Sequence, residues 1–483
     1  MEKRETLKEK TAKGLFWGGL SNGFQQLLNL VFGVFLARLL STSDYGMVGM
    51  LAVFSAIAST LQEGGFISAL NRKKDVTHQD YNSVFWTSCC ISLFFYLLLF
   101  FSAPLIARFY NIAELVPLSR VMFLSFVIVS LSIAPRAYLF RNLMVRENTI
   151  ISITCLLISG FVGVIMALSG FGYWSIVAQT IVYVSVVTIL NFYYAKWRPT
   201  FSFDISPIKE IIGFSSKLII TNIFNIVNNN IFAIVLGRLY SPHEVGNYTQ
   251  ASKWNNMGCS FVNNMLSGIA QPVFSKTEQE KKRQKKVFRK LLRFTAFISF
   301  PTMLGLSLIS QELIVILLTE KWIESAQILQ ILCVAGAFLP ISNLFSNLLI
   351  SRGHSSTYMW CSISLCIIQL VGVFLSSSWG IIMMIQVYTV INIIWLFIWY
   401  FYTSKEIDLC LLEVIKDISP YFVISCVLVI IAHMMVAHIE NMILSLCVKI
   451  LFVGSAYCLT LWLLQSTIFK EVITYIIKRK VKQ

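Results

Sequence analysis

The sequence predicts an all-α membrane protein with about fourteen transmembrane helices: two pseudo-symmetric six-helix lobes around a central cavity, plus two C-terminal helices. Three observations support this fold class. Of the 483 residues, 57% are hydrophobic and only 13% are charged, a balance far more apolar than that of a soluble globular protein. Apolar stretches of about 20 residues, the length that an α-helix needs to cross a bilayer, recur along the chain. A repeat relates the two halves.

The predicted helices are apolar stretches separated by short polar breaks. We expect them at residues 15–38, 45–69, 82–107, 116–134, 149–168, 173–194, 211–237, 245–271, 291–318, 325–350, 355–377, 380–402, 420–438 and 442–467.

The net charge of +16 would fit a nucleic-acid partner, but the cations lie between apolar stretches and not on a soluble face. With the amino terminus inside, most Lys and Arg fall in cytoplasmic segments. The outer side carries only Arg38, Arg108, Arg120, Arg238 and Lys321. This asymmetry predicts a bacterial inner-membrane protein with both termini in the cytoplasm and no nucleic-acid partner.

The densest basic run, residues 276–293, is expected to be an inner loop that faces anionic headgroups of membrane lipids. The eleven cysteines include no CxxC pair and lie mostly within apolar stretches. We therefore expect no disulfide framework, no metal site and no cofactor.

Residues 21–50 align without a gap to residues 221–250. The matched pairs include Asn22 and Asn222, Asn29 and Asn229, Arg38 and Arg238, Ser41 and Ser241, and Gly46 and Gly246. Six predicted spans, an even number, separate the two segments, so both enter the membrane from the same side. The halves should therefore be parallel repeats about an axis along the membrane normal. We expect lobes at 1–200 and 201–403, and two further helices with a cytoplasmic tail at 404–483.

Polar side chains inside membrane spans are costly, so their placement is informative. They form stripes on the first two spans of each half, and a hydrated cavity between the halves would give these stripes a role. The candidate substrate-binding residues are Asn22, Gln25, Asn29, Asn222, Asn225, Asn229 and Asn256, with Trp254 offering an apolar face to a sugar ring. The alternative is that the stripes hold helices together. Both interpretations are open.

Charged residues of the spans also have two interpretations each. Lys217 and Lys253 either compensate a diphosphate in the cavity or extend to the nearer interface. Arg38 with Asp44, and Arg238 with Glu244, either form ion pairs that cap an outer gate or contact substrate. Glu63 either carries a coupling proton or is hydrated at the interface.

Several segments carry a resemblance to a known family: FLARLLSTSDYG, LQEGGFISALNRKKDVTHQDYNSVFW, GFGYWSIVAQ, GRLYSPHEVGNYTQAS and PVFSK. Over nearly its whole length the chain resembles the Wzx-type polysaccharide and O-antigen flippases of the multidrug/oligosaccharidyl-lipid/polysaccharide exporter superfamily. The resemblance implies alternating access that moves an undecaprenyl-diphosphate-linked oligosaccharide from the inner to the outer leaflet, for lipopolysaccharide, capsule or exopolysaccharide assembly. It implies a cationic cavity, no enzymatic activity, and pathway partners such as a polymerase and glycosyltransferases.

Two other functions are alternatives. A cation-coupled multidrug exporter of the same superfamily usually needs membrane-buried carboxylates, and the spans contain no convincing one. Relatives often have an acidic residue in the seventh span, where this chain has Asn228, Asn229 and Asn230. A membrane glycan polymerase would need an acidic catalytic site or a large outer loop, and the outer connections are mostly under about ten residues.

Overall fold

The computed structural model describes the backbone of residues 7–63, 70, 76–200, 222–276, 280–471 and 474. Side chains are described over the same residues except 7–22, 61–63, 267–272 and 275–276. Over this part of the chain the secondary structure is helical and contains no strand. Contacts divide the chain into two compact units, Met1–Gly246 and Asn247–Gln483. The lobe boundaries expected at residues 200/201 and 403/404 stay a prediction.

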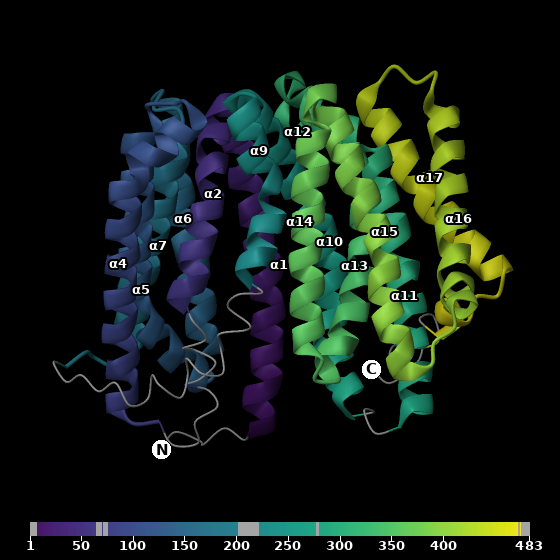
Figure 1. The fold of residues 1–483 in the computed structure, drawn as a ribbon, viewed down its shortest axis with the longest axis horizontal. Coiled ribbons are helices and arrows are strands. Elements are labelled where there is room, and N and C mark those ends of the chain that lie inside the picture. The colour runs from purple at the N-terminus through teal and green to yellow at the C-terminus, as the bar shows by residue number, and fades with distance from the viewer. Residues whose placement is uncertain are drawn as a thin grey trace. The chain divides into compact units, whose positions relative to one another are not determined.

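The first unit contains a bundle of long helices (Figure 1). Its helices are α1 (Leu7–Leu39), α2 (Thr42–Glu63), α4 (His78–Tyr110), α5 (Leu115–Arg141), α6 (Val145–Leu168), α7 (Trp174–Tyr194), α9 (Ile231–Leu239) and the first turn of α10 (Pro242–Lys276). Helix α6 packs between α1 and α7, α5 packs against both α4 and α7, and α9 contacts α2 and α4.

The second unit begins within α10. It continues with α11 (Lys281–Leu308), α12 (Ser310–Leu318), η1 (Glu320–Trp322), α13 (Ile323–Ser351), α14 (Ser355–Leu375), η2 (Ser377–Trp379), α15 (Ile381–Ile407), α16 (Leu411–Val436) and α17 (Met442–Leu463). Helix α13 packs against α11, α14 and α15, and the last two helices, α16 and α17, pack on each other and on α11.

Ten helices among the described residues are long and apolar enough to cross a membrane. They correspond to the predicted spans 3 to 6 and 9 to 14, which confirms a multi-pass all-α membrane protein. Of the other four predicted spans, the second and seventh include residues outside the described backbone, and the first and eighth include residues whose side chains are not described, so the count of fourteen stays a prediction.

Helix α6 shows how such a sequence packs when its outer solvent is lipid. Ser159 is buried and Gly160 and Gly163 lie on the same inner face, whereas Phe161 and Ile165 are exposed. A Cβ added to Gly160 would lie 2.5 Å from the Phe32 ring of α1. Small residues therefore let the helices approach closely, while large apolar side chains face outward, as is usual in membrane bundles.

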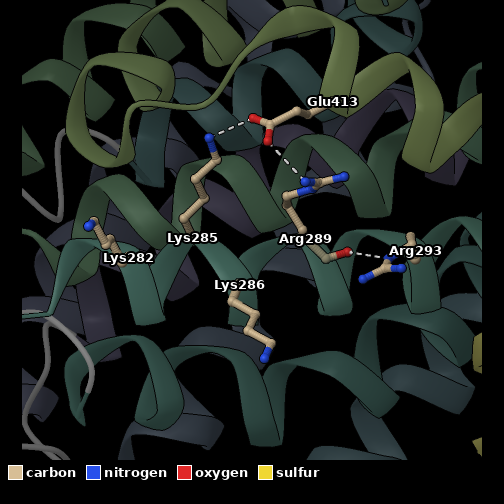
Figure 2. A pocket seen from close by; sticks show the side chains of 6 residues that line it. All are labelled: Lys282, Lys285, Lys286, Arg289, Arg293 and Glu413. Atoms are coloured by element: carbon tan, nitrogen blue, oxygen red, sulfur yellow. Dashed lines mark hydrogen bonds and ion pairs between the residues drawn. The ribbon is translucent and has the colours of Figure 1, made fainter.

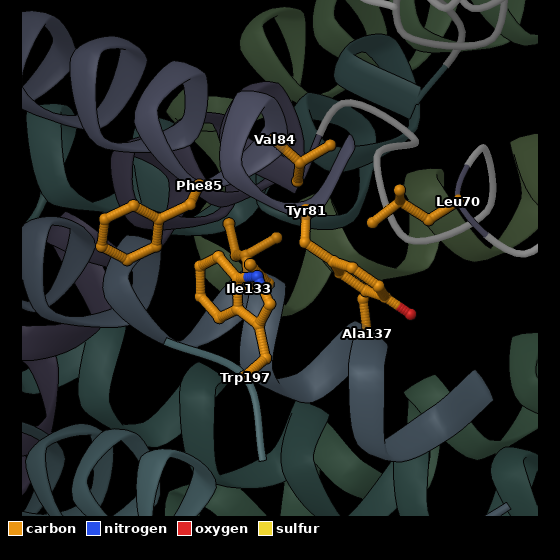
Figure 3. Packing of buried hydrophobic residues seen from close by; sticks show 8 residues of the cluster. Leu70, Tyr81, Val84, Phe85, Ile133, Ala137 and Trp197 are labelled. Carbon is orange, nitrogen blue, oxygen red and sulfur yellow. The ribbon is translucent and has the colours of Figure 1, made fainter. Parts of the chain in front are cut away.

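The first unit contains a buried cluster of aromatic and aliphatic side chains (Figure 3). Trp197, from the segment after α7, packs against Phe85 of α4 and Ile133 of α5. Beside the cluster, the Asn82 Nδ2 atom donates to the Thr200 carbonyl at 2.6 Å. These contacts fix the segment that leaves α7 against the bundle.

Two predicted spans are interrupted, and the predicted basic loop is helical. The seventh span breaks at Asn230, whose side-chain amide donates to the Ile226 carbonyl at 2.8 Å. Asparagine competes for backbone carbonyls in this way and so disfavours a helix interior. The ninth span breaks at Ile309, between α11 and α12. Helix α11 starts at Lys281, so residues 281–293 form its first turns, and the expectation of a loop there was wrong.

Candidate functional site

The sequence repeat reappears in the helix boundaries. Helix α1 ends at Leu39 and α2 begins at Thr42, while α9 ends at Leu239 and α10 begins at Pro242. Both boundaries are thus displaced by the same 200 residues as the aligned sequences. The two segments therefore share the same turn between helices.

The acidic residues of the repeat, Asp44 and Glu244, lie in the first turns of α2 and α10. Each accepts a hydrogen bond from the serine that precedes its helix. The Ser41 backbone N–H and hydroxyl donate to Asp44 Oδ2 at 2.9 and 2.6 Å. Likewise, the Ser241 N–H donates to Glu244 Oε2 at 3.1 Å. A carboxylate at a helix N-terminus satisfies otherwise unpaired N–H groups and interacts favourably with the helix dipole.

The ion pairs expected at these positions stay a prediction. The carboxylates of Asp44 and Glu244 accept hydrogen bonds from the nearby cap donors. Arg238 donates to the Phe109 carbonyl at 2.8 Å, and its guanidinium lies 5.6 Å from the Phe109 ring centre. This arginine thereby links the ends of α9 and α4.

The first turns of α2 and α10 cross in backbone contact. A Cβ added to Gly46 would lie 1.7 Å from the Pro242 carbonyl oxygen, and one added to Gly246 would lie 1.8 Å from the Thr42 carbonyl oxygen. Beside the crossing, Thr42 Oγ1 and His243 Nδ1 are 2.5 Å apart. Only glycine fits at either position, and the two contacts are related by the repeat.

Beyond this crossing, α10 has one accessible polar face. Lys253, Asn256, Ser260 and Asn264 are all exposed and recur at spacings of three and four residues, which places them on one side of the helix. The opposite side is buried within the second unit: Asn255, Cys259 and Val262 pack there. The exposed side combines one cation with amide and hydroxyl groups.

Trp254 lies on the buried side. Its side chain is 8% exposed, so the indole face is not available to a sugar in this conformation. We do not include Trp254 among the contacts of the proposed site.

The other predicted residues are found as follows. Asn29, Asn222 and Asn229 are exposed, while Gln25 and Asn225 are half-buried. Asn22 and Glu63 lie in helices, but their side chains are outside the described residues, as is the whole of Lys217.

A carboxamide-lined pocket of about 260 Å³ lies between α10, α13 and α14, and its α13 side was missed by the sequence analysis. Its polar lining includes Asn263, Asn343, Asn347 and Tyr358. The Asn343 amide donates to Asn263 Oδ1 at 3.2 Å. Asn343 and Asn347 are four residues apart in an apolar span, and this spacing was the available signal.

The fold and these polar surfaces define a multi-pass α-helical membrane protein with an internal repeat and amide-rich surfaces. Residues 35–327 match the family described as "Polysaccharide biosynthesis protein", so the chain belongs to this family. The match agrees with the resemblance noted in the sequence.

Individual proteins are also similar to this chain over most of its length. Lipopolysaccharide biosynthesis protein WzxC of Escherichia coli (strain K12) is 26% identical over 359 residues, covering 72% of this chain and 71% of the relative. Teichuronic acid biosynthesis protein TuaB of Bacillus subtilis (strain 168) is 22% identical over 430 residues, covering 88% and 89%. The solved structure titled lipid II flippase MurJ, inward closed conformation, superposes with a TM-score of 0.74 at 15% identity, covering 93% of this chain and 99% of that one. This last similarity is one of fold.

Proposed function

We propose that the protein is a flippase that moves an undecaprenyl-diphosphate-linked oligosaccharide from the inner to the outer leaflet of the bacterial inner membrane by alternating access. The accessible polar face of α10 carries this proposal, because a membrane protein has little reason to keep Lys253 and three polar neighbours accessible unless water or a polar substrate meets them. The names of the relatives, which refer to lipopolysaccharide and teichuronic acid biosynthesis, support a glycan substrate.

The residue types suit the two polar parts of such a substrate. A diphosphate that leaves the headgroup layer loses hydration and is heavily penalised unless a cation compensates its charge. Lys253 would supply that charge, together with Lys217. Carboxamides both donate and accept hydrogen bonds. Asn256, Asn264 and the carboxamide-lined pocket between α10, α13 and α14 are therefore suited to binding sugar hydroxyls.

The crossing of α2 and α10 would act as the outer gate. Its two backbone contacts are symmetric by the repeat, so a rotation of the repeat-related helices would break both together. Alternating access needs such a closed contact that can separate as a unit. Gly46 and Gly246 let the helices close without side chains between them.

The experiment that tests this function is a substitution of Lys253 by Gln in the full chain, in a cell whose surface glycan depends on it. Gln keeps polarity and approximate size but removes the charge. We expect normal membrane insertion, loss of surface glycan and accumulation of the lipid-linked precursor inside. Lys470→Gln is the matched control, because Lys470 is an exposed cation in contact with Gln465; it should leave surface glycan unchanged. Normal glycan from a well-expressed Lys253→Gln protein would refute the role of this cation.

A further inference from the structure

The N-terminal turns of α11 carry many positive charges, although the N-terminus of a helix favours negative charge. Eight of the thirteen residues from Lys281 to Arg293 are Lys or Arg. Cations are disfavoured at a helix N-terminus by the dipole, and Lys282 and Lys286 also repel each other at a spacing of four residues. Some compensating anion is therefore needed.

Helix α16 supplies part of that compensation. The Arg289 guanidinium donates to Asp417 Oδ2 at 2.7 Å and to Glu413 Oε1 at 2.9 Å. Lys285 Nζ lies 2.6 Å from Glu413 Oε2, and Arg293 Nε lies 3.6 Å from Asp417 Oδ1. The Asp417 side chain is 5% exposed, so this network joins α11 to α16 in a partly buried position.

The compensation is incomplete around the pocket that these residues form. The pocket has a volume of about 500 Å³ and is lined by Lys282, Lys285, Lys286, Arg289, Arg293 and Glu413 (Figure 2). Five cations thus face two carboxylates, Glu413 and the adjoining Asp417. Lys282 and Lys286 are exposed, and neither forms an ion pair with another described residue. The pocket keeps room and an excess of positive charge for an anion.

The position of the pocket along α11 indicates where that anion comes from. The basic residues end at Arg293, and the remainder of α11 is apolar through Leu308. A helix that changes from basic to apolar in this way crosses the headgroup layer at the change, where anionic lipids attract Lys and Arg.

We propose that this pocket of α11 and α16 binds a phosphate group, carried by the headgroup of an anionic lipid. Lys282 and Lys286 contact the phosphate directly, and Arg289 and Lys285, held by Glu413, form the floor. The site lies outside the transport contacts proposed above and does not depend on them. Bound lipid would add the anion that the α11–α16 junction lacks.

The test is binding of short-chain lipids to the purified full chain in non-ionic detergent, followed by native mass spectrometry. Dioctanoyl phosphatidic acid, which carries a phosphate monoester, should bind saturably, and dioctanoyl phosphatidylcholine, which is neutral overall, should bind more weakly. Lys282→Gln/Lys286→Gln should weaken phosphatidic acid binding about tenfold or more, since each lysine in contact with the anionic headgroup contributes roughly a factor of five.

The matched control is Lys281→Gln/Lys290→Gln, which removes the same charge from the same turns but from residues that do not line the pocket. It should retain binding within about twofold. An equal loss in both double variants would overturn the proposal, because it would reveal diffuse attraction by the basic helix. So would the absence of saturable phosphatidic acid binding.

A parallel titration with inorganic phosphate distinguishes the source of the group. Phosphatidic acid should bind more tightly than inorganic phosphate, so that a large excess of inorganic phosphate is needed to displace it. Equal affinities that fall together in Lys282→Gln/Lys286→Gln would keep the phosphate site but overturn its assignment to a lipid.

Discussion

Gly46 and Gly246 occupy equivalent positions of the repeat, and each lies against the backbone at the start of the other's helix. A Cβ on Gly46 would be 1.7 Å from the Pro242 carbonyl oxygen, and a Cβ on Gly246 would be 1.8 Å from that of Thr42. Such distances leave no room for any side chain. The crossing of α2 and α10 is therefore set by these two glycines.

Replacing either glycine by alanine should open the crossing. We expect Gly46→Ala and Gly246→Ala each to cost about 1–3 kcal/mol, the usual range for overpacking, and to reduce transport. Thermal unfolding in detergent and surface glycan measure the two effects. Gly454→Ala is the control, because an added Cβ there meets nothing within 4 Å; it should be neutral or slightly stabilising. Equal stability of all three variants would contradict the described contact.

Substitutions of Asn343 test whether the carboxamide pocket contacts sugar hydroxyls or whether Asn343 only holds the helices together. Asn343→Leu removes both hydrogen-bonding groups of a side chain that lines the pocket, whereas Asn343→Gln keeps the amide. If the pocket meets sugar hydroxyls, Leu should abolish surface glycan with an unfolding temperature within a few degrees of the parent, and Gln should retain partial function. If Asn343 only joins α13 to α10, Leu should lower stability and expression along with function.

The buried pair of Glu312 and Lys449 joins α12 to α17. Both side chains are buried, and Ser445 also donates to Glu312 at 2.8 Å. Lys449→Met alone should cost about 3–5 kcal/mol, because it leaves a buried carboxylate without its partner. Glu312→Gln/Lys449→Met should recover much of that loss. Additive costs in a double-mutant cycle of thermal unfolding would show that the pair is not coupled.

The predicted topology places the Lys- and Arg-rich segments in the cytoplasm. Reporter fusions after residues 75, 280 and 480 should all report a cytoplasmic location. An external signal at any one of them would contradict the topology, and with it the placement of the α2–α10 crossing on the outer side.

Much of the fold follows from the sequence because lipid imposes simple rules. Apolar length predicted α4 and α13 to within a few residues, and the alignment of residues 21–50 with 221–250 predicted that two helix boundaries would recur at the same offset. These features depend on composition and periodicity, which the sequence displays directly.

The parts that were missed depend on competition between local partners. Asn230 breaks its span because its amide bonds the Ile226 carbonyl, and apolarity does not report such a bond. Asp44 accepts hydrogen bonds from the Ser41 N–H and hydroxyl, a helix cap that the spacing of Arg38 and Asp44 does not reveal. Which donor prevails depends on the geometry of the helix end.

The candidate site was likewise predicted only in part from the sequence. Asn256 of the predicted polar stripe is exposed, and Lys253, which was predicted separately, is exposed on the same face of α10. The burial of Trp254 did not follow, because a single aromatic residue at the edge of a stripe can lie on either side. Which other helices complete a pocket depends on tertiary packing, as with Asn343.

The most direct test of the central claim is translocation by the purified full chain in proteoliposomes. A fluorescent undecaprenyl-diphosphate-linked oligosaccharide is placed in both leaflets, and a membrane-impermeant quencher reports the fraction that is exposed outside. We expect protein-dependent translocation that Lys253→Gln abolishes and Lys470→Gln leaves intact. Exposure no faster than in protein-free vesicles, or equal rates for the parent and Lys253→Gln, would contradict it.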